Sequence, residues 1–74
     1  MVEVDARGLS CPIPVLRTKQ ALDKNPDKCC VLVDAYVQVE NVTRMAQSKG
    51  YTCKSERDGD FYKIIITKKE AGNA

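Results

Sequence analysis

Asp5-Ala6-Arg7-Gly8-Leu9-Ser10-Cys11-Pro12-Ile13-Pro14 is the stretch that joins a short apolar strand to a helical pattern. Gly8 is interpreted as a tight turn that ends the strand. Pro14 is compatible with the first turn of a helix, because the N–H that proline lacks has no intrahelical partner there. Cys11 is therefore expected at or just before the N-terminus of a helix.

This expected position favours a reactive thiol at Cys11. Free backbone N–H groups and the positive end of the helix dipole stabilise an anion, so the pKa of the thiol is expected to fall. Pro12 and Pro14 stiffen the segment, which holds the sulfur outward. The alternative is that Cys11 is a small buried hydrophobic residue, as free cysteines often are.

The composition predicts one small cytoplasmic domain. The chain has 74 residues and a net charge of +2, from 12 basic and 10 acidic residues, which is too balanced to indicate nucleic acid as the partner. No apolar run is long enough to cross a membrane, and the N-terminus does not resemble a signal peptide.

Four cysteines are present, without histidine and without a Cys-x-x-Cys pair. This pattern argues against a zinc site, and we expect no cofactor and no metal. We also expect reduced thiols rather than a disulfide framework. Cys29 and Cys30 should face opposite sides of a strand and fill space, although a second sulfur-accepting thiol is the alternative. Cys53 has no role that the sequence identifies.

Turn signals and apolar periodicity divide the whole chain into six elements. Asn25-Pro26-Asp27 ends the first helix and Gly50 ends the second, while Asp58-Gly59 indicates a hairpin. Leu16 is expected beside the apolar face of the first helix. The expected helices cover residues 14–24 and 39–49, and the expected strands cover residues 2–6, 29–36, 51–57 and 61–67.

These elements predict an α+β fold, a two-layer sandwich with the order βαβαββ. Strand-helix-strand crossovers give parallel strands, and the final hairpin makes the fourth strand antiparallel. The apolar runs Val31-Leu32-Val33 and Ile64-Ile65-Ile66 indicate that the second and fourth strands are internal. The expected mixed four-stranded sheet therefore has the order 1-2-4-3, with both helices on one face. Cys11 would lie at the carboxyl end of the first strand, where open α/β sheets place their sites.

Asp5, Arg7-Gly8-Leu9 and Cys11-Pro12-x-Pro14 resemble the TusA/SirA-like sulfur-carrier family. The resemblance covers residues 1–68 as one TusA-like domain, and residues 69–74 are expected to form a flexible tail. A second block, residues 40–51, is similar to the TusA-like domain of YedF proteins, which are associated with selenium metabolism.

The resemblance implies a carrier that works through a persulfide. It implies that Cys11 accepts sulfur from a cysteine desulfurase and that a downstream acceptor protein receives it, in some cases toward tRNA thiolation. Selenium is the alternative cargo. Whether such a stoichiometric carrier counts as an enzyme is left open.

Asp5 and Arg7 have two interpretations within this site. In the first, Asp5 orients Arg7, which stabilises the thiolate or persulfide anion of Cys11. In the second, they form an ordinary surface ion pair, worth about 0–1 kcal/mol.

Two other functions are considered, an RNA-binding module and a redox-sensing interaction module. Arg17, Lys19, Lys24 and Lys28 could form a basic patch. Acidic residues are mixed with them and no aromatic residue is interleaved, which argues against direct RNA binding. No membrane partner is expected.

Overall fold

The computed structural model describes residues 2–10 and 12–68, and the expected order of six elements is confirmed. Two helices and four strands follow one another in the predicted order βαβαββ. The elements are β1 (Val2–Asp5), α1 (Ile13–Leu22), β2 (Lys28–Val33), α2 (Tyr36–Ser48), β3 (Tyr51–Asp58) and β4 (Phe61–Lys68).

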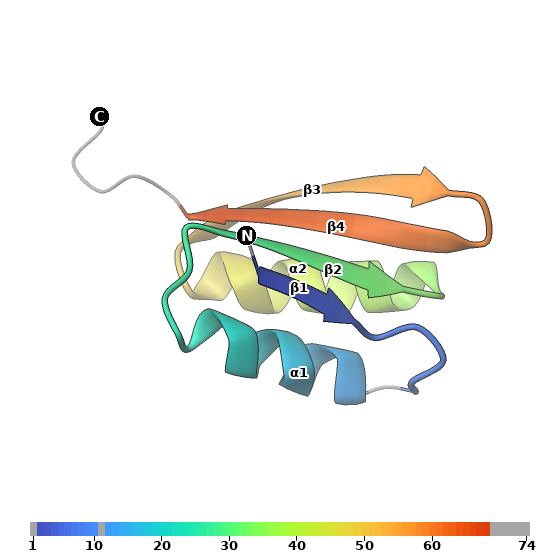
Figure 1. Ribbon diagram of the computed structural model, residues 1–74, viewed down its shortest axis with the longest axis horizontal. Coiled ribbons are helices and arrows are strands. Elements are labelled where there is room, and N and C mark those ends of the chain that lie inside the picture. Colours follow the sequence, from blue (N-terminus) through green and yellow to red (C-terminus); the bar gives the residue numbers. More distant parts are fainter. Residues whose placement is uncertain (1, 11, 69–74) are drawn as a thin grey trace.

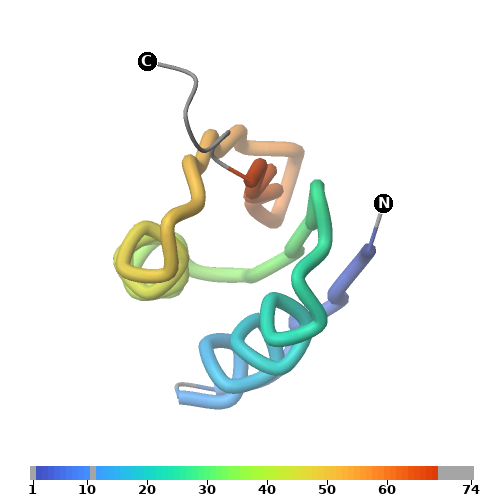
Figure 2. The backbone as a smooth tube through the Cα atoms, turned by 90° about the vertical axis from the view of Figure 1, so that its left-hand side faces the viewer, coloured from blue at the N-terminus to red at the C-terminus, as the bar shows by residue number. Residues whose placement is uncertain are grey.

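The strands form one sheet in the expected order β1-β2-β4-β3. β1 runs parallel to β2, and β4 runs antiparallel to both β2 and β3. Both helices cover the same face of the sheet, which leaves the other face open (Figures 1 and 2). The two apolar strands are internal because each pairs along both edges, whereas β1 and β3 are the edge strands.

The core lies between the sheet and the helices. Its fully buried side chains include Val31 and Val33 from β2, Ile64 and Ile66 from β4, and Val42 from α2. Burying side chains of this size contributes about 1.5–3 kcal/mol each. This packing fixes which face of each strand points inward.

The expected alternation of the paired cysteines is confirmed. Cys29 belongs to the buried core cluster, whereas Cys30, although only 7% exposed, is not part of it. Successive strand residues point to opposite faces, so Cys30 lies on the open side of the sheet.

The junction between β2 and α2 differs from the prediction. β2 was expected to continue to Tyr36 and α2 to begin at Val39, but β2 ends at Val33 and α2 begins at Tyr36. The side chain of Gln38 explains the early start, because its Oε1 accepts hydrogen bonds from the backbone N–H groups of Asp34 and Ala35. This satisfies N–H groups that have no partner within a helix.

The end of α1 was also predicted too late. The helix was expected to reach Lys24 but ends at Leu22. Asn25 adopts a positive φ of 59°, and its N–H donates to the carbonyl oxygen of Leu22 at 2.9 Å. Asn tolerates this left-handed conformation better than most residues, so it closes the helix before Pro26.

Neither helix in the described ranges is long and apolar enough to cross a membrane.

Candidate functional site

The loop between β1 and α1 lies at the end of the sheet where both helices begin (Figure 1). Ala6 is fully buried, and its N–H donates to the carbonyl oxygen of Leu32 at 2.9 Å. The chain is therefore hydrogen-bonded to β2 as far as Ala6, where the loop begins. The N–H of Leu9 donates back to the carbonyl oxygen of Ala6 at 3.3 Å. Gly8, in this turn, has a φ of +78°, which explains the glycine. Cys11 itself lies outside the described residues, so its exposure and pKa stay predictions.

Asp5 and Arg7 form a two-pronged ion pair on the strand side of this loop. Nε and Nη2 of Arg7 each donate to a carboxylate oxygen of Asp5 at 2.9 Å, and the backbone N–H of Arg7 donates to the same carboxylate at 3.2 Å. These side-chain and backbone hydrogen bonds lower the pKa of Asp5 to about 2. The same side-chain bond raises the pKa of Arg7.

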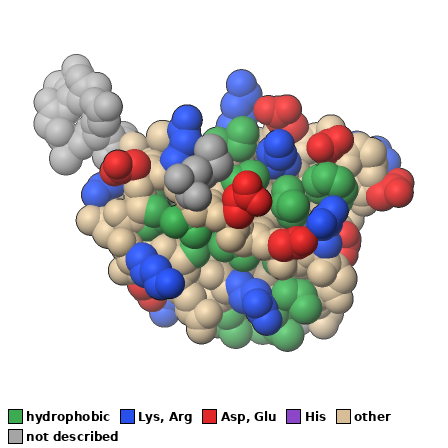
Figure 3. All heavy atoms as spheres, in the orientation of Figure 1, with side chains coloured by type: hydrophobic (Ala, Val, Ile, Leu, Met, Phe, Trp, Pro, Cys, Tyr) green, Lys and Arg blue, Asp and Glu red, His purple; other side chains and the backbone are tan. Residues whose placement is uncertain are grey.

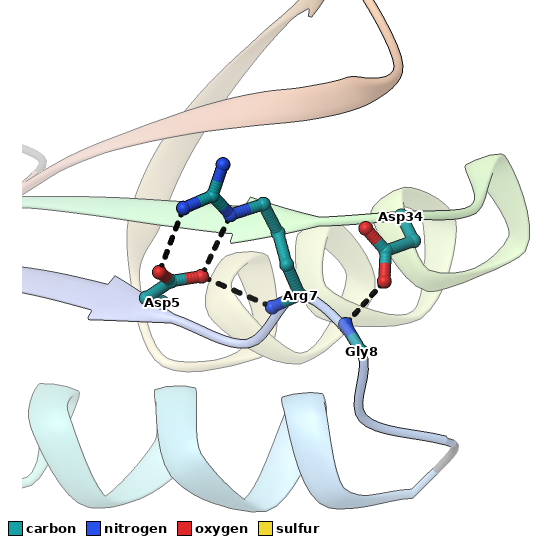
Figure 4. Close-up of polar contacts among 4 residues, drawn as sticks. All are labelled: Asp5, Arg7, Gly8 and Asp34. Carbon is teal, nitrogen blue, oxygen red and sulfur yellow. Dashed lines mark hydrogen bonds and ion pairs between the residues drawn. The ribbon is translucent and has the colours of Figure 1, made fainter.

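The guanidinium group of Arg7 points toward the carboxylate of Asp5 and away from the loop beyond Gly8, which runs toward α1 (Figure 4). The guanidinium carbon of Arg7 also lies 4.8 Å from the ring centroid of Phe61, at the start of β4. This separation is within the range of a cation–π contact. The ion pair that both interpretations of Asp5 and Arg7 require is therefore present. The action of Arg7 on the sulfur of Cys11 stays a prediction.

Asp34 contacts the loop of the candidate site and was not predicted from the sequence. One of its carboxylate oxygens accepts a hydrogen bond from the backbone N–H of Gly8, across the gap between the two parallel strands (Figure 4). Asp34 follows β2 directly, and polar residues at the carboxyl ends of parallel strands often line a site. That signal was available, but the strand was predicted to continue past it.

Gln38 was missed as well, and it anchors the loop from the helix side. Its Nε2 donates to the carbonyl oxygen of Leu9 at 2.9 Å, while its Oε1 lies 3.2 Å from the N of Asp34 and 3.3 Å from the N of Ala35. Gln38 is only 8% exposed. One buried amide thus connects the loop between β1 and α1 to the start of α2.

The two prolines lie where α1 begins. Pro12 is the N-cap residue, and its carbonyl oxygen accepts a hydrogen bond from the N–H of Leu16 at 3.1 Å. Pro14 is buried in the first turn, as expected, and its carbonyl oxygen accepts a bond from Oγ1 of Thr18 at 2.8 Å. Cys11 therefore directly precedes, in the sequence, the N-cap of a helix.

Four apolar side chains near the starts of the two helices are exposed, and we call them the apolar rim. Leu16 was expected beside the apolar face of α1 but is 51% exposed. The exposed fractions of the others are 40% for Ile13, 57% for Tyr36 and 56% for Val37. These side chains are exposed near the end of the sheet where the loop lies, so they are available to contact another molecule.

The other three thiols are in a different environment. Burial raises the pKa of Cys29, Cys30 and Cys53. The Sγ of Cys53 also lies 3.9 Å from the carbonyl oxygen of Thr43. A raised pKa lowers the thiolate fraction at neutral pH, so we expect these three thiols to react more slowly than an exposed thiol.

Among residues 2–10 and 12–68, no three Cys, Asp or Glu side chains are grouped so that they could hold a metal ion.

Comparisons with known proteins agree on one family. The family model described as sulfurtransferase TusA matches residues 2–68. A protein of Methanocaldococcus jannaschii, named as a candidate sulfur carrier, is 35% identical over 71 residues, which cover 92% of this chain and 95% of that protein.

Two solved structures share the fold. The crystal structure of a SirA-like protein from Desulfitobacterium hafniense has a TM-score of 0.84 and 35% identity, and the match covers 95% of this chain and all of that one. The solution structure of a Helicobacter pylori protein has a TM-score of 0.65 at 21% identity, with the same coverage, and supports the fold alone.

Proposed function

We propose, since this chain belongs to the TusA family of sulfurtransferases, that it accepts sulfur on Cys11 from a cysteine desulfurase and relays it to an acceptor protein. The observation that carries this proposal is the anchored loop that leads into α1. Asp34 and Gln38 hold it at Gly8 and Leu9, and Pro12 is the N-cap residue of α1.

The proposed chemistry is thiol exchange on a persulfide. The thiolate of Cys11 attacks the outer sulfur of a donor persulfide, R–S–S–H. The donor S–S bond breaks as a new S–S bond forms on Cys11, the donor leaves as R–S⁻, and the proton stays on the transferred sulfur. This step requires no oxidant and no general base, only an accessible thiol with a low pKa.

The apolar rim supports direct contact with protein partners. Sulfur passes only between atoms in contact, so donor and acceptor must both approach the loop. Leu16 and Val37 are exposed near the starts of α1 and α2, at the end of the sheet where the loop lies. Large apolar side chains that become buried at an interface can each contribute more than 1 kcal/mol to binding.

The first experiment is intact-mass measurement after incubation with a cysteine desulfurase and cysteine. We expect addition of one sulfur atom to the wild type and to Cys53→Ser, and none to Cys11→Ser. Addition that persists in Cys11→Ser would assign the chemistry to another thiol. No addition with several desulfurases, under conditions that load a known carrier, would contradict the carrier proposal.

A second experiment addresses the docking role of the apolar rim. The double variant Leu16→Gln with Val37→Gln should load sulfur about tenfold more slowly, the equivalent of roughly 1.4 kcal/mol. Its rate of alkylation by iodoacetamide at Cys11 should be unchanged, because a small reagent needs no docking surface. Lys19→Gln, an exposed substitution on the same helix, is the matched control. Equal loading rates in all variants would contradict docking at the rim.

The cargo and the downstream path belong to the same proposal. Loading with a selenium donor in place of cysteine distinguishes a selenium carrier, as the YedF-like block suggests, from a sulfur carrier. Transfer from loaded protein to an enzyme of tRNA thiolation tests one acceptor class. We place the carrier in the cytoplasm, where thiols stay reduced.

A further inference from the structure

A groove runs between the free edge of β1 and α1, on the side of the molecule away from β2. Its volume is about 590 Å³. β1 is an edge strand that pairs with β2 alone. Figure 2 shows β1, in dark blue, at the margin of the sheet with α1 beside it. The groove is lined by Val2, Glu3, Val4, Asp5, Arg17, Gln20, Ala21 and Lys24.

The edge of β1 presents hydrogen-bonding groups to this groove. The N–H of Ala6 donates to β2, at the carbonyl oxygen of Leu32. In a parallel pair the residues of one strand direct their N–H and C=O groups alternately toward the partner and away from it. The backbone groups of Glu3 and Asp5 therefore face the open edge, where an added strand could pair with them.

The two faces of this edge differ in chemistry. On the helix side, Val2 and Val4 are partly buried against the core and form an apolar floor with Ala21. Arg17 on α1 and Lys24 in the turn that follows it line the opposite wall. On the opposite side, Glu3 and Asp5 are exposed. Figure 3 shows basic side chains over the lower layer, where α1 lies, and both acidic and basic side chains above them.

Charge complementarity identifies the kind of segment that fits. In an added strand, side chains on the helix side meet the apolar floor and the cations of the wall. Those on the open side lie next to Glu3, and next to Asp5, whose carboxylate is already paired with Arg7. The best match has aliphatic and acidic residues on one side and Lys or Arg on the other. A second copy matches poorly, because its own Glu3 would add a second carboxylate to the same face.

We propose that the β1 edge and the β1–α1 groove form a strand-addition site for an extended segment of another protein, with Val or Glu on the groove side and Lys on the open side. Main-chain hydrogen bonds to β1 supply affinity, and Arg17 and Lys24 select an acidic side chain. The charged side chains of β1 keep this short edge from pairing with further copies. The groove binds its segment independently of sulfur transfer by Cys11.

The test titrates the ¹⁵N-labelled full chain with the blocked peptide acetyl-Lys-Val-Lys-Glu-Lys-Val-amide, up to millimolar concentration. We expect amide shifts that saturate and are confined to residues 2–5 and to the groove side of α1. Acetyl-Val-Val-Glu-Lys-Lys-Lys-amide, with the same composition but no alternation, should cause no saturable shift. A peptide methylated on the amides that face β1 should also fail to bind, because it cannot donate to the strand.

Two charge-reversal variants complete the test. Arg17→Glu should raise the dissociation constant of the alternating peptide at least several-fold, while Lys19→Glu, on the same helix but outside the groove, should leave it unchanged. Equal binding of the scrambled or methylated peptide would overturn strand addition. So would absence of any shift, shifts elsewhere, or a dimer that forms through β1 without peptide.

Discussion

Gln38 connects the loop between β1 and α1 to the start of α2 through its side-chain amide. Gln38→Leu replaces this amide with an apolar side chain of nearly the same size. Three hydrogen bonds disappear, from the N–H groups of Asp34 and Ala35 and to the carbonyl oxygen of Leu9. A typical protein hydrogen bond contributes about 0.5–1.5 kcal/mol net. The loss of all three should therefore lower the free energy of unfolding by about 1.5–4.5 kcal/mol.

The expected loss lies toward the lower end of this range. The two bonds to Oε1 are long, at 3.2 and 3.3 Å, and Asp34 is exposed, so water replaces part of what is lost. We expect a decrease of about 2 kcal/mol in the free energy of unfolding, similar to the loss of a strong helix cap. For a domain of this size that lowers the Tm by roughly 8–16 °C.

Thermal and urea denaturation followed by circular dichroism measure this change. The matched control is Gln47→Leu, the same substitution on the same helix at an exposed position. Amide hydrogen exchange gives a local readout, because the N–H groups of Asp34 and Ala35 should exchange faster in Gln38→Leu than in the wild type. If Gln38→Leu shifts the Tm no more than Gln47→Leu does, the side chain does not hold this junction together.

Three further predictions concern backbone conformation, acid stability and thiol reactivity. Gly8→Ala should cost about 1–2 kcal/mol by urea denaturation, because φ is +78° and an added Cβ meets no atom within 4 Å, so only backbone strain contributes; an unchanged midpoint would contradict this reasoning. The low pKa of Asp5 adds stability that is complete above its ordinary value of 3.8 and is lost as the pH falls through about 2. The stability difference between wild type and Asp5→Asn should therefore shrink from pH 5 to pH 2, while Arg7 stays charged, and a constant difference would refute it. Iodoacetamide at pH 8 should modify Cys29 and Cys30 far more slowly in the folded protein than in guanidinium, as measured by peptide mass spectrometry, because burial raises both pKa values; equal rates would contradict this.

The family and the sheet were predictable from local features. The resemblance to TusA/SirA-like proteins is confirmed by the family match over residues 2–68, while closeness to YedF stays a prediction. The strand order followed from the two continuous apolar runs and from the handedness of crossovers. Gly50, with a φ of +89°, ends α2 as predicted.

The sequence could name only those candidate site residues that are near one another along the chain, and their roles stay predictions. Asp5, Arg7, Gly8, Pro12 and Pro14 are near one another in the sequence, so local turn and helix rules apply to them. The partners that anchor the loop come from the β2–α2 junction, 26 and 29 residues away. No periodicity in the sequence indicates a contact of that kind.

The sequence by itself determined that a cysteine precedes a helix start after the first strand, because glycine and proline restrict the backbone locally. The tertiary structure decided what anchors the loop between β1 and α1 at Gly8 and Leu9. Parallel pairing of β1 with β2 brings the ends of both strands to the same edge of the sheet, and only there do Asp34 and Gln38 reach the loop. Side-chain hydrogen bonds act over about 3 Å, so they depend on packing in three dimensions rather than on spacing along the chain.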